Sequence, residues 1–308
     1  MAESFSAVSF QVVVLFILIG VGFILTKCRF LTKECVNGLV KIILYSVTPC
    51  VIVESFHREF DPDLLRQLGI AVLASFVSHL LNIVLAHLLV REKDKARRCV
   101  YQFGIVFTNC GYMALPLQNA LLGSDGVFFG AAYIAVFNLL NWTYGIVLLD
   151  NEKTKISLSK VFINPGIIGV CVGLFFFLTP FSLPPVLFTP VKLLADLNTP
   201  LPMMVIGFYL AGITSFALLK DKNFLTAMIL SLIVAPLCSF GVLYLMQIRG
   251  PMFVSMIIAA ASPVGANTVM FSNMFNKDAE VAGTLVAVST LFSILTMPLI
   301  VAFAIYFM

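Results

Sequence analysis

The sequence predicts an all-α polytopic membrane protein of ten transmembrane helices, built as two inverted repeats of five helices each. Three observations predict it: an apolar composition, a one-sided distribution of basic residues, and an internal sequence repeat. Of the 308 residues, 60% are hydrophobic and 11% are charged, and the mean hydropathy is +1.05. A soluble domain needs about twice that charged fraction to cover its surface. The apolar runs are long and lack strict alternation, which favours helices over a β-barrel.

Ten apolar segments are long enough to cross a bilayer when the chain is scanned with a window of about 20 residues. The connections between them are short, and none is typical of a soluble domain. We therefore expect a first repeat over 1–150, a short cytoplasmic linker over 151–162 and a second repeat over 163–308. The predicted spans are 8–25, 36–56, 67–90, 98–122, 126–149, 163–179, 189–217, 223–247, 251–275 and 279–307.

The basic residues are distributed unevenly between the two sides of these spans. Loops on one side carry fourteen Lys and Arg residues, whereas loops on the other side carry three, Arg58, Arg66 and Arg249. The positive-inside rule assigns the basic side to the cytoplasm, so we expect a multi-pass protein of the cell membrane with both termini extracytoplasmic. An odd number of spans would destroy this sorting. Glu3 is the only charge before the first span, and the N-terminus does not resemble a cleaved signal.

An internal repeat relates the two halves of the chain. Because each half holds five spans, an odd number, the second copy must run through the bilayer in the opposite direction. Inverted repeats of this kind are typical of secondary transporters. The two matches, at offsets of 151 and 154 residues, are VKIILYSVTPCV (40–51) with VKLLADLNTPLP (191–202), and TNCGYMALPLQNALLG (108–123) with SPVGANTVMFSNMFNK (262–277).

The second match places helix breakers inside two apolar spans, at Gly111 to Pro116 and at Ser262 to Thr268. Unpaired backbone at membrane depth costs several kcal/mol per group, and it is tolerated only where protein or a wet cavity surrounds it. Interrupted helices expose N-termini that favour anions, and Asn109, Asn267 and Thr268 add neutral donors and acceptors. The alternative interpretation is that these breakers are packing devices or kinks.

Three motifs resemble those of the auxin efflux carrier family of permeases. That family includes malonate and malate permeases and is related to the plant PIN-type auxin carriers. The motifs are N109-C-G-Y-M-A-L-P-L117, N138-L-L-N-W-T-Y-G145 and A261-S-P-V-G-A-N267.

The resemblance implies a fold of the bile-acid-symporter type, in which broken spans 4 and 9 cross near the membrane centre. Spans 1, 2, 6 and 7 would form a scaffold, and spans 3–5 and 8–10 a moving transport domain. It further implies that Asn109 binds the substrate carboxylate, that Pro116 and Pro263 are the crossover prolines, and that Tyr144 is an aromatic contact to the cavity. The candidate substrate-binding residues are Asn109, Gly111, Pro116, Pro263, Gly265, Asn267, Thr268 and Tyr144.

A few polar residues inside the spans are candidates for ion or proton coupling, because intramembrane ionisable groups are often functional. His79 in span 3 could titrate near neutral pH, or it could be a neutral histidine hydrogen-bonded between helices. Asp196 could pair with Lys192 four residues earlier. Alternatively, Asp196 faces a cavity together with Asn198 and helps to bind a cation or proton.

These features favour a secondary transporter that moves a small organic carboxylate by alternating access. We expect no cofactor, metal ion or nucleic-acid partner, and the coupling ion, H⁺ or Na⁺ if any, is left open. The seven cysteines form no CxxC pair and are interpreted as free thiols. The partners are the carboxylate and the bilayer, and the resemblance allows a homodimer. A sensor or channel on the same fold is the alternative; an enzyme is disfavoured because no HExxH motif, Ser–His pair or paired-Asp arrangement is evident.

Overall fold

The computed structural model describes residues 2–150, 165–179, 181–212 and 217–307, and every element in this part of the chain is a helix. The predicted linker 151–162 and the first two residues of predicted span 6 lie outside the described residues. The helices of the first half are α1 (Ala2–Lys27), α2 (Lys33–Ile42), α3 (Thr48–Phe56), α4 (Pro62–Leu89), α5 (Lys95–Val106), α6 (Leu115–Trp142) and α7 (Tyr144–Leu149). Those of the second half are α9 (Pro165–Leu178), α10 (Pro185–Ala195), α11 (Pro200–Ala211), α12 (Lys222–Ile229), α13 (Ala235–Leu245), α14 (Gly250–Ala261), α15 (Asn267–Met274) and α16 (Ala279–Tyr306).

Several of these helices join through short π- or 3₁₀-helical turns into longer membrane-length stretches. Among the described residues, six stretches are long and apolar enough to cross a bilayer. This confirms a membrane protein made of helices, whereas the count of ten spans stays a prediction. The six are Lys33–Phe56, Pro62–Leu89, Cys110–Leu149, Pro185–Ala211, Lys222–Leu245 and Ala279–Tyr306.

The difference between ten predicted spans and six long stretches has local causes. The 40-residue stretch Cys110–Leu149 contains predicted span 5 and the second half of span 4, and the chain turns between them at Gly123 (φ 60°, ψ −147°). Helices α5 and α14 have only 12 residues each, because each ends at an interruption. The apolar stretches of α1 and α9 are also shorter than a full span.

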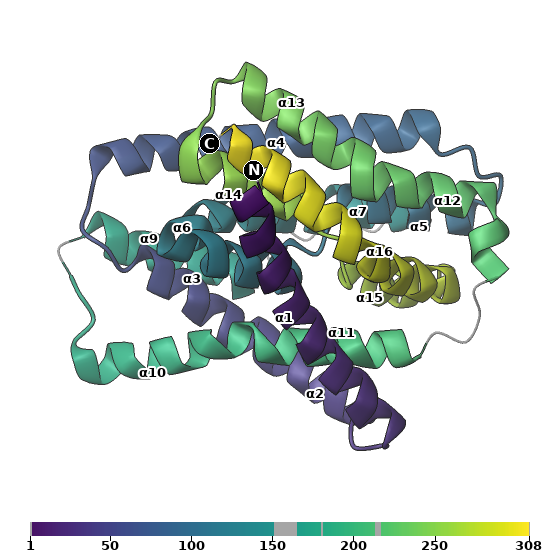
Figure 1. Ribbon diagram of the computed structural model, residues 1–308, viewed down its shortest axis with the longest axis horizontal. Helices are drawn as coiled ribbons and strands as arrows, with labels where there is room; N and C mark the ends of the chain where they lie inside the picture. Colours follow the sequence, from purple (N-terminus) through teal and green to yellow (C-terminus); the bar gives the residue numbers. More distant parts are fainter. Residues whose placement is uncertain (1, 151–164, 180, 213–216, 308) are drawn as a thin grey trace.

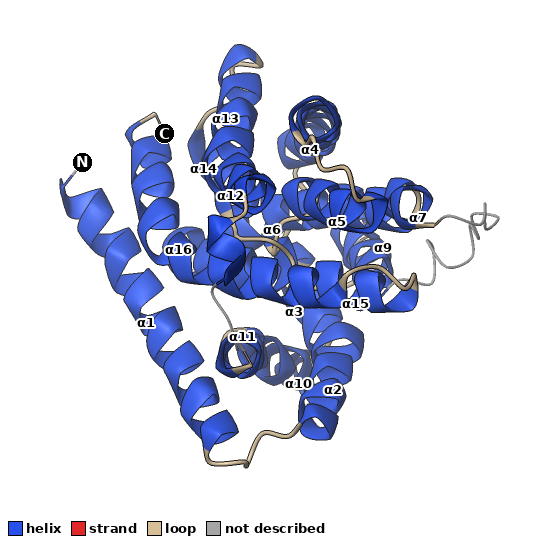
Figure 2. Cartoon of the chain, turned by 90° about the vertical axis from the view of Figure 1, so that its right-hand side faces the viewer, coloured by secondary structure: helices blue, strands red, loops and turns tan. Residues whose placement is uncertain are grey.

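The helices form layers that enclose a central group. Figure 1 shows α4 along one edge and α10 with α11 along the opposite edge, and the same order is visible in the turned view of Figure 2. Helices α5, α6 and α14 lie between these edges, and α6 packs against both α4 and α14. The two chain ends lie near each other in both views, as expected if both termini are on the same side of the membrane.

Two close contacts join a helix of the first half to a helix of the second half, and the residues at these contacts are related by the repeat. Helix α1 lies against α11 at Gly22 and Gly207, where a β-carbon on either glycine would collide with the backbone of the other helix. Helix α9 lies against α3 at Gly173, where a β-carbon would lie 3.1 Å from the side chain of Phe56. Gly173 lies 151 residues after Gly22, and Gly207 lies 151 residues after Phe56. The two contacts are therefore related by the offset that aligns 40–51 with 191–202.

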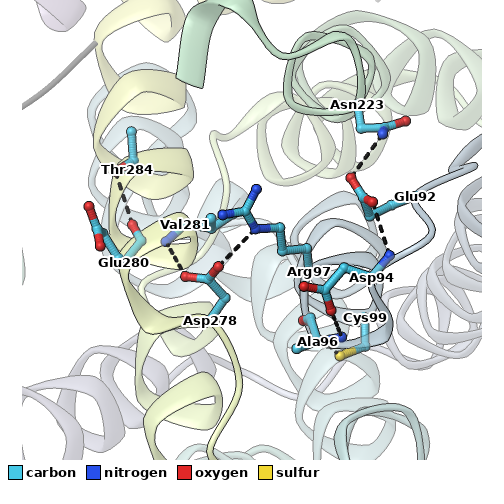
Figure 3. Close-up of polar contacts among 10 residues, drawn as sticks. All are labelled: Glu92, Asp94, Ala96, Arg97, Cys99, Asn223, Asp278, Glu280, Val281 and Thr284. Carbon is cyan, nitrogen blue, oxygen red and sulfur yellow. Dashed lines mark hydrogen bonds and ion pairs between the residues drawn. The ribbon is translucent and has the colours of Figure 1, made fainter. Parts of the chain in front are cut away.

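Polar contacts connect loops that the basic-residue sorting assigns to one side. Figure 3 shows Arg97 Nε 3.0 Å from Asp278 Oδ2, and Asn223 Nδ2 donating to Glu92 Oε2 at 2.9 Å. These contacts join the loops before α5, α12 and α16, all of them predicted to be cytoplasmic. On the other side, Arg58 forms an ion pair of 2.6 Å with Asp125, which joins two loops predicted to be extracytoplasmic.

We predict that Gly22→Ala destabilises the protein, because the added methyl group would meet the backbone of Met204 on α11. Overpacking of this kind costs about 1–3 kcal/mol, which exceeds the gain of up to about 1 kcal/mol in helix propensity. Thermal unfolding of the detergent-purified protein measures the effect. Gly20→Ala in the same helix is the control, since no atom lies within 4 Å of its added β-carbon. Equal melting temperatures for the two variants would contradict the close contact.

Candidate functional site

Two helix interruptions meet in the interior of the protein. Residues 107–109 follow α5, residues 262–266 follow α14, and Thr108 and Val264 form an isolated antiparallel β-bridge. The Asn109 N–H donates to the Pro263 carbonyl at 2.7 Å, and the Gly265 N–H donates to the Phe107 carbonyl at 2.9 Å. A β-carbon on Gly265 would lie 2.9 Å from the Thr108 carbonyl oxygen, so this approach requires glycine.

Several other polar groups of the interruptions also have partners, as buried backbone usually does. The Asn109 carbonyl accepts from the Met113 N–H at 3.1 Å, and the Val264 N–H donates to Ser289 Oγ at 3.2 Å. Thr108 Oγ1 donates to the carbonyl of Ala259 at 2.9 Å. The bridge and the Thr108 bond therefore stabilise the breaks across the two halves, and the other two bonds act within one half.

The two interruptions differ in how closely they match the predicted positions. In the second half, α14 ends at Ala261 and α15 begins at Asn267, close to the predicted break. In the first half, the break lies at 107–109, about four residues before the predicted Gly111 to Pro116. Gly111 lies in a π-helical turn, Cys110–Ala114, and Pro116 lies in the first turn of α6. Proline has no N–H to donate and is tolerated in a first turn, so it begins this helix rather than ending one.

A cavity of about 220 Å³ lies beside the paired interruptions. Its walls come from the π-helical turn Ile43–Val47 and the start of α3, from α6, the start of α9, both interruptions and α15. The described residues that line it include no Lys, Arg, His, Asp or Glu. Its polar side chains are those of Tyr45, Thr48, Thr108, Asn109, Tyr112, Asn138, Asn141 and Asn267, together with the indole of Trp142.

Several of these polar atoms have no hydrogen-bond partner within the described chain. They are Nδ2 of Asn109, both amide atoms of Asn141, and Oγ1 of Thr48, all of them buried. Leaving a buried donor or acceptor unpaired costs about 1–3 kcal/mol. The cavity therefore offers neutral hydrogen-bonding groups to a small polar molecule.

Four of the predicted substrate-binding residues line this cavity, and four do not. Asn109, Gly111, Gly265 and Asn267 line it, from both halves of the chain. Pro263 contributes its carbonyl to the bridge, and Pro116 is buried in α6. Thr268 is fully buried behind the cavity wall, with Oγ1 unpaired among the described residues. Tyr144 lies elsewhere, with its hydroxyl 3.4 Å from His87 Nδ1.

The residues considered for ion coupling lie outside the cavity wall. His79 is buried between α4 and α6, with Nδ1 2.8 Å from the Ser75 carbonyl and its ring 4.7 Å from that of Tyr133. Asp196 is exposed, and no ion pair joins it to Lys192 in the described part of the chain. Asn198 is buried, with Oδ1 unpaired among the described residues.

Sequence reasoning did not assign Thr48, Asn138 and Asn141 to the site, although they line the cavity. A signal was present, because Asn138 and Asn141 are three residues apart in an apolar helix and therefore share a face. Thr48 and Pro49 lie near the end of the repeated segment 40–51.

Comparison with known proteins identifies the family. A family model described as "Membrane transport protein" matches the chain twice, over residues 7–162 and 152–301. An uncharacterized transporter of Methanothermobacter thermautotrophicus is 22% identical over 293 residues, covering 92% of this chain and 94% of the relative. These matches confirm the resemblance seen in the three sequence motifs. The chain belongs to the membrane transport protein family, also called the auxin efflux carrier family, and is a membrane transporter.

Proposed function

We propose that this transporter is a secondary carrier that moves a small organic carboxylate, malonate-like, malate-like or auxin-like, across the cell membrane by alternating access. The observation that carries the proposal is the uncharged, asparagine-lined cavity beside two paired helix interruptions. Interrupted helices in corresponding halves are the usual site of substrate binding in transporters with inverted repeats.

The proposed architecture is ten spans in two inverted repeats whose broken spans cross at the bridge between Thr108 and Val264. Three findings support it: the antiparallel pairing of the interruptions, the related contacts of α1 with α11 and of α9 with α3, and the two successive family matches. Among the described residues, the two ion pairs and the contact between Asn223 and Glu92 each join segments that this topology assigns to the same side.

The carboxylate would bind without a cationic side chain. Two helices begin at the cavity. The π-helical turn that leads into α6 begins directly after Asn109, and α15 begins at Asn267. Helix N-termini carry free N–H groups and partial positive charge that stabilise anions. The amides of Asn109 and Asn141 add donors whose hydrogen bonds with a carboxylate are stronger than those with a neutral acceptor.

Alternating access would involve movement between the scaffold and the transport domain. The cavity lies between elements assigned to the scaffold (the turn Ile43–Val47, α3 and α9) and elements assigned to the transport domain (α6 and α15). Its wall includes the exposed side chains of Tyr45 and Met274, and Met274 lies three residues before Lys277 of a predicted cytoplasmic loop. This arrangement corresponds to a cavity open toward the cytoplasm.

The opposite side is closed by contacts between the same two groups of elements. The Phe128 ring of α6 lies 4.7 Å from the Phe56 ring of α3 and 5.5 Å from the Phe177 ring of α9. Arg58 pairs with Asp125 at 2.6 Å and its guanidinium lies 4.7 Å from the Phe128 ring. In the proposed cycle these contacts separate when the cavity opens outward.

His79, Asp196 and Asn198 are retained as candidates for coupling to H⁺ or Na⁺, and a homodimer through the scaffold remains part of the proposal.

We predict that Asn109→Ala lowers carboxylate transport by roughly 10- to 100-fold, which corresponds to the loss of about 1.5–3 kcal/mol of hydrogen bonding to an ionised group. Uptake of radiolabelled malonate, malate and indole-3-acetate into proteoliposomes measures the rate. Asn37→Ala, at an exposed asparagine of α2, is the matched control and should transport like the parent. Equal rates for the two variants would refute the role of Asn109.

We also predict that Asp125→Asn favours the outward-open form, because it removes the charge that Arg58 pairs with. Cys110 lines the cavity, so it reports access once the other six cysteines are replaced by serine. A membrane-impermeant maleimide added from the extracytoplasmic side should label Cys110 up to about fivefold faster in Asp125→Asn, since such ion pairs contribute up to about 1 kcal/mol. Asp63→Asn, an exposed carboxylate predicted on the same side, is the control and should leave the labelling rate unchanged.

A further inference from the structure

A second pocket opens between the ends of α4, α5 and α7 on the basic side of the protein. Its volume is about 440 Å³, and it shares no lining residue with the cavity at the interruptions. The described residues that line it include no Asp or Glu. Its polar side chains are those of His87, Lys95, Arg98, Gln102 and Tyr144.

Two cationic side chains at the start of α5 are available to this pocket. Lys95 and Arg98 are three residues apart on the helix and therefore lie on the same face. Neither forms an ion pair with a described residue, whereas Arg97 between them is turned to Asp278 (Figure 3). The carboxylate of Asp94, which precedes them, accepts the Ala96 N–H at 2.8 Å. The N-terminal end of α5 adds partial positive charge at the same place.

Neutral polar groups also line the pocket. Gln102 lies one turn after Arg98 and is only 6% exposed. Its side chain makes no hydrogen bond with a described residue. On the opposite wall, the Tyr144 hydroxyl lies 3.4 Å from His87 Nδ1. An amide and a phenol can both donate hydrogen bonds to an oxyanion. The pocket thus combines two cations with a buried amide and a half-buried phenol.

Apolar side chains on the outside of the protein border the pocket. Val147 of α7 lines it and is 59% exposed, and Leu88 at the end of α4 is 65% exposed. Exposed apolar surface next to a basic pocket suits an amphiphile whose charged group enters the pocket while its chains follow the helices. An inorganic ion would use only the polar half of this surface.

We propose that this pocket binds the phosphate group of an anionic glycerophospholipid, with the acyl chains lying along α4 and α7. Lys95 and Arg98 bind the phosphate oxygens, and Gln102 donates to the headgroup from below. Basic pockets between helices on the cytoplasmic side are suited to anionic headgroups, because that leaflet carries the anionic lipids. The leaflet assignment rests on the topology proposed above.

Native mass spectrometry of the full-length purified protein tests this by titration with phosphatidylglycerol and with phosphatidylcholine of the same acyl chains. We expect Lys95→Gln/Arg98→Gln to weaken phosphatidylglycerol binding roughly 30-fold, at about fivefold per basic residue. Lys220→Gln/Lys222→Gln removes two exposed charges predicted on the same side but outside the pocket, and should bind as the parent does. Gln102→Leu keeps both cations and is expected to weaken binding severalfold.

Equal affinity for phosphatidylglycerol in the two double variants would overturn the proposal, and so would equal affinity of the parent for both lipids. Melting temperatures measured without added lipid establish that each variant is folded. Glycerol 3-phosphate and inorganic phosphate, titrated alone by thermal shift, distinguish a headgroup from a free anion. If either compound stabilises the protein with an affinity equal to that of the lipid, the ligand of this pocket is a soluble phosphate and not a lipid.

Discussion

The structure depends on one constraint, which is that backbone polar groups removed from water must be paired. Two helices are interrupted in the protein interior, and each interruption supplies the partner that the other lacks. The hydrogen bonds from Asn109 N–H to Pro263 and from Gly265 N–H to Phe107 are backbone to backbone, and glycine at position 265 lets the two segments approach. A single interruption would leave these groups unpaired at a cost of several kcal/mol each.

The polar character of the cavity follows from this pairing. Because the breaks are stabilised by each other, the side chains beside them are free to face the cavity, and Asn109 and Asn141 leave amide atoms unpaired among the described residues. The lining is polar without being charged, which avoids the large cost of burying an uncompensated ion when the cavity is empty. Helix termini provide the electrostatic attraction in place of a lysine or an arginine.

Charged residues are used at the two ends of the molecule instead. Arg58 with Asp125, and Arg97 with Asp278, join segments distant in sequence, and each pair is partly solvated. Such pairs are weak individually, which suits contacts that hold a conformation without preventing its change. The close helix pair at Gly22 and Gly207, by contrast, depends on small residues that let two backbones approach, a common packing device in membranes.

The sequence by itself determined the membrane-helix class, the family and the presence of paired interruptions, because apolar length, short motifs and proline or glycine positions are local properties. The break in the second half lies close to its predicted position. The break in the first half was predicted about four residues too far along the chain, because Pro116 could equally end one helix or begin the next. Only the tertiary structure decided which side chains share the cavity. A helix turns by about 100° per residue, so neighbouring residues face different surroundings. Asn141 lines the cavity, whereas Leu140, one position earlier, does not. Tyr144 and His79 are as plausible as Asn109 in the sequence, yet the packing of α4 and α7 directs them elsewhere.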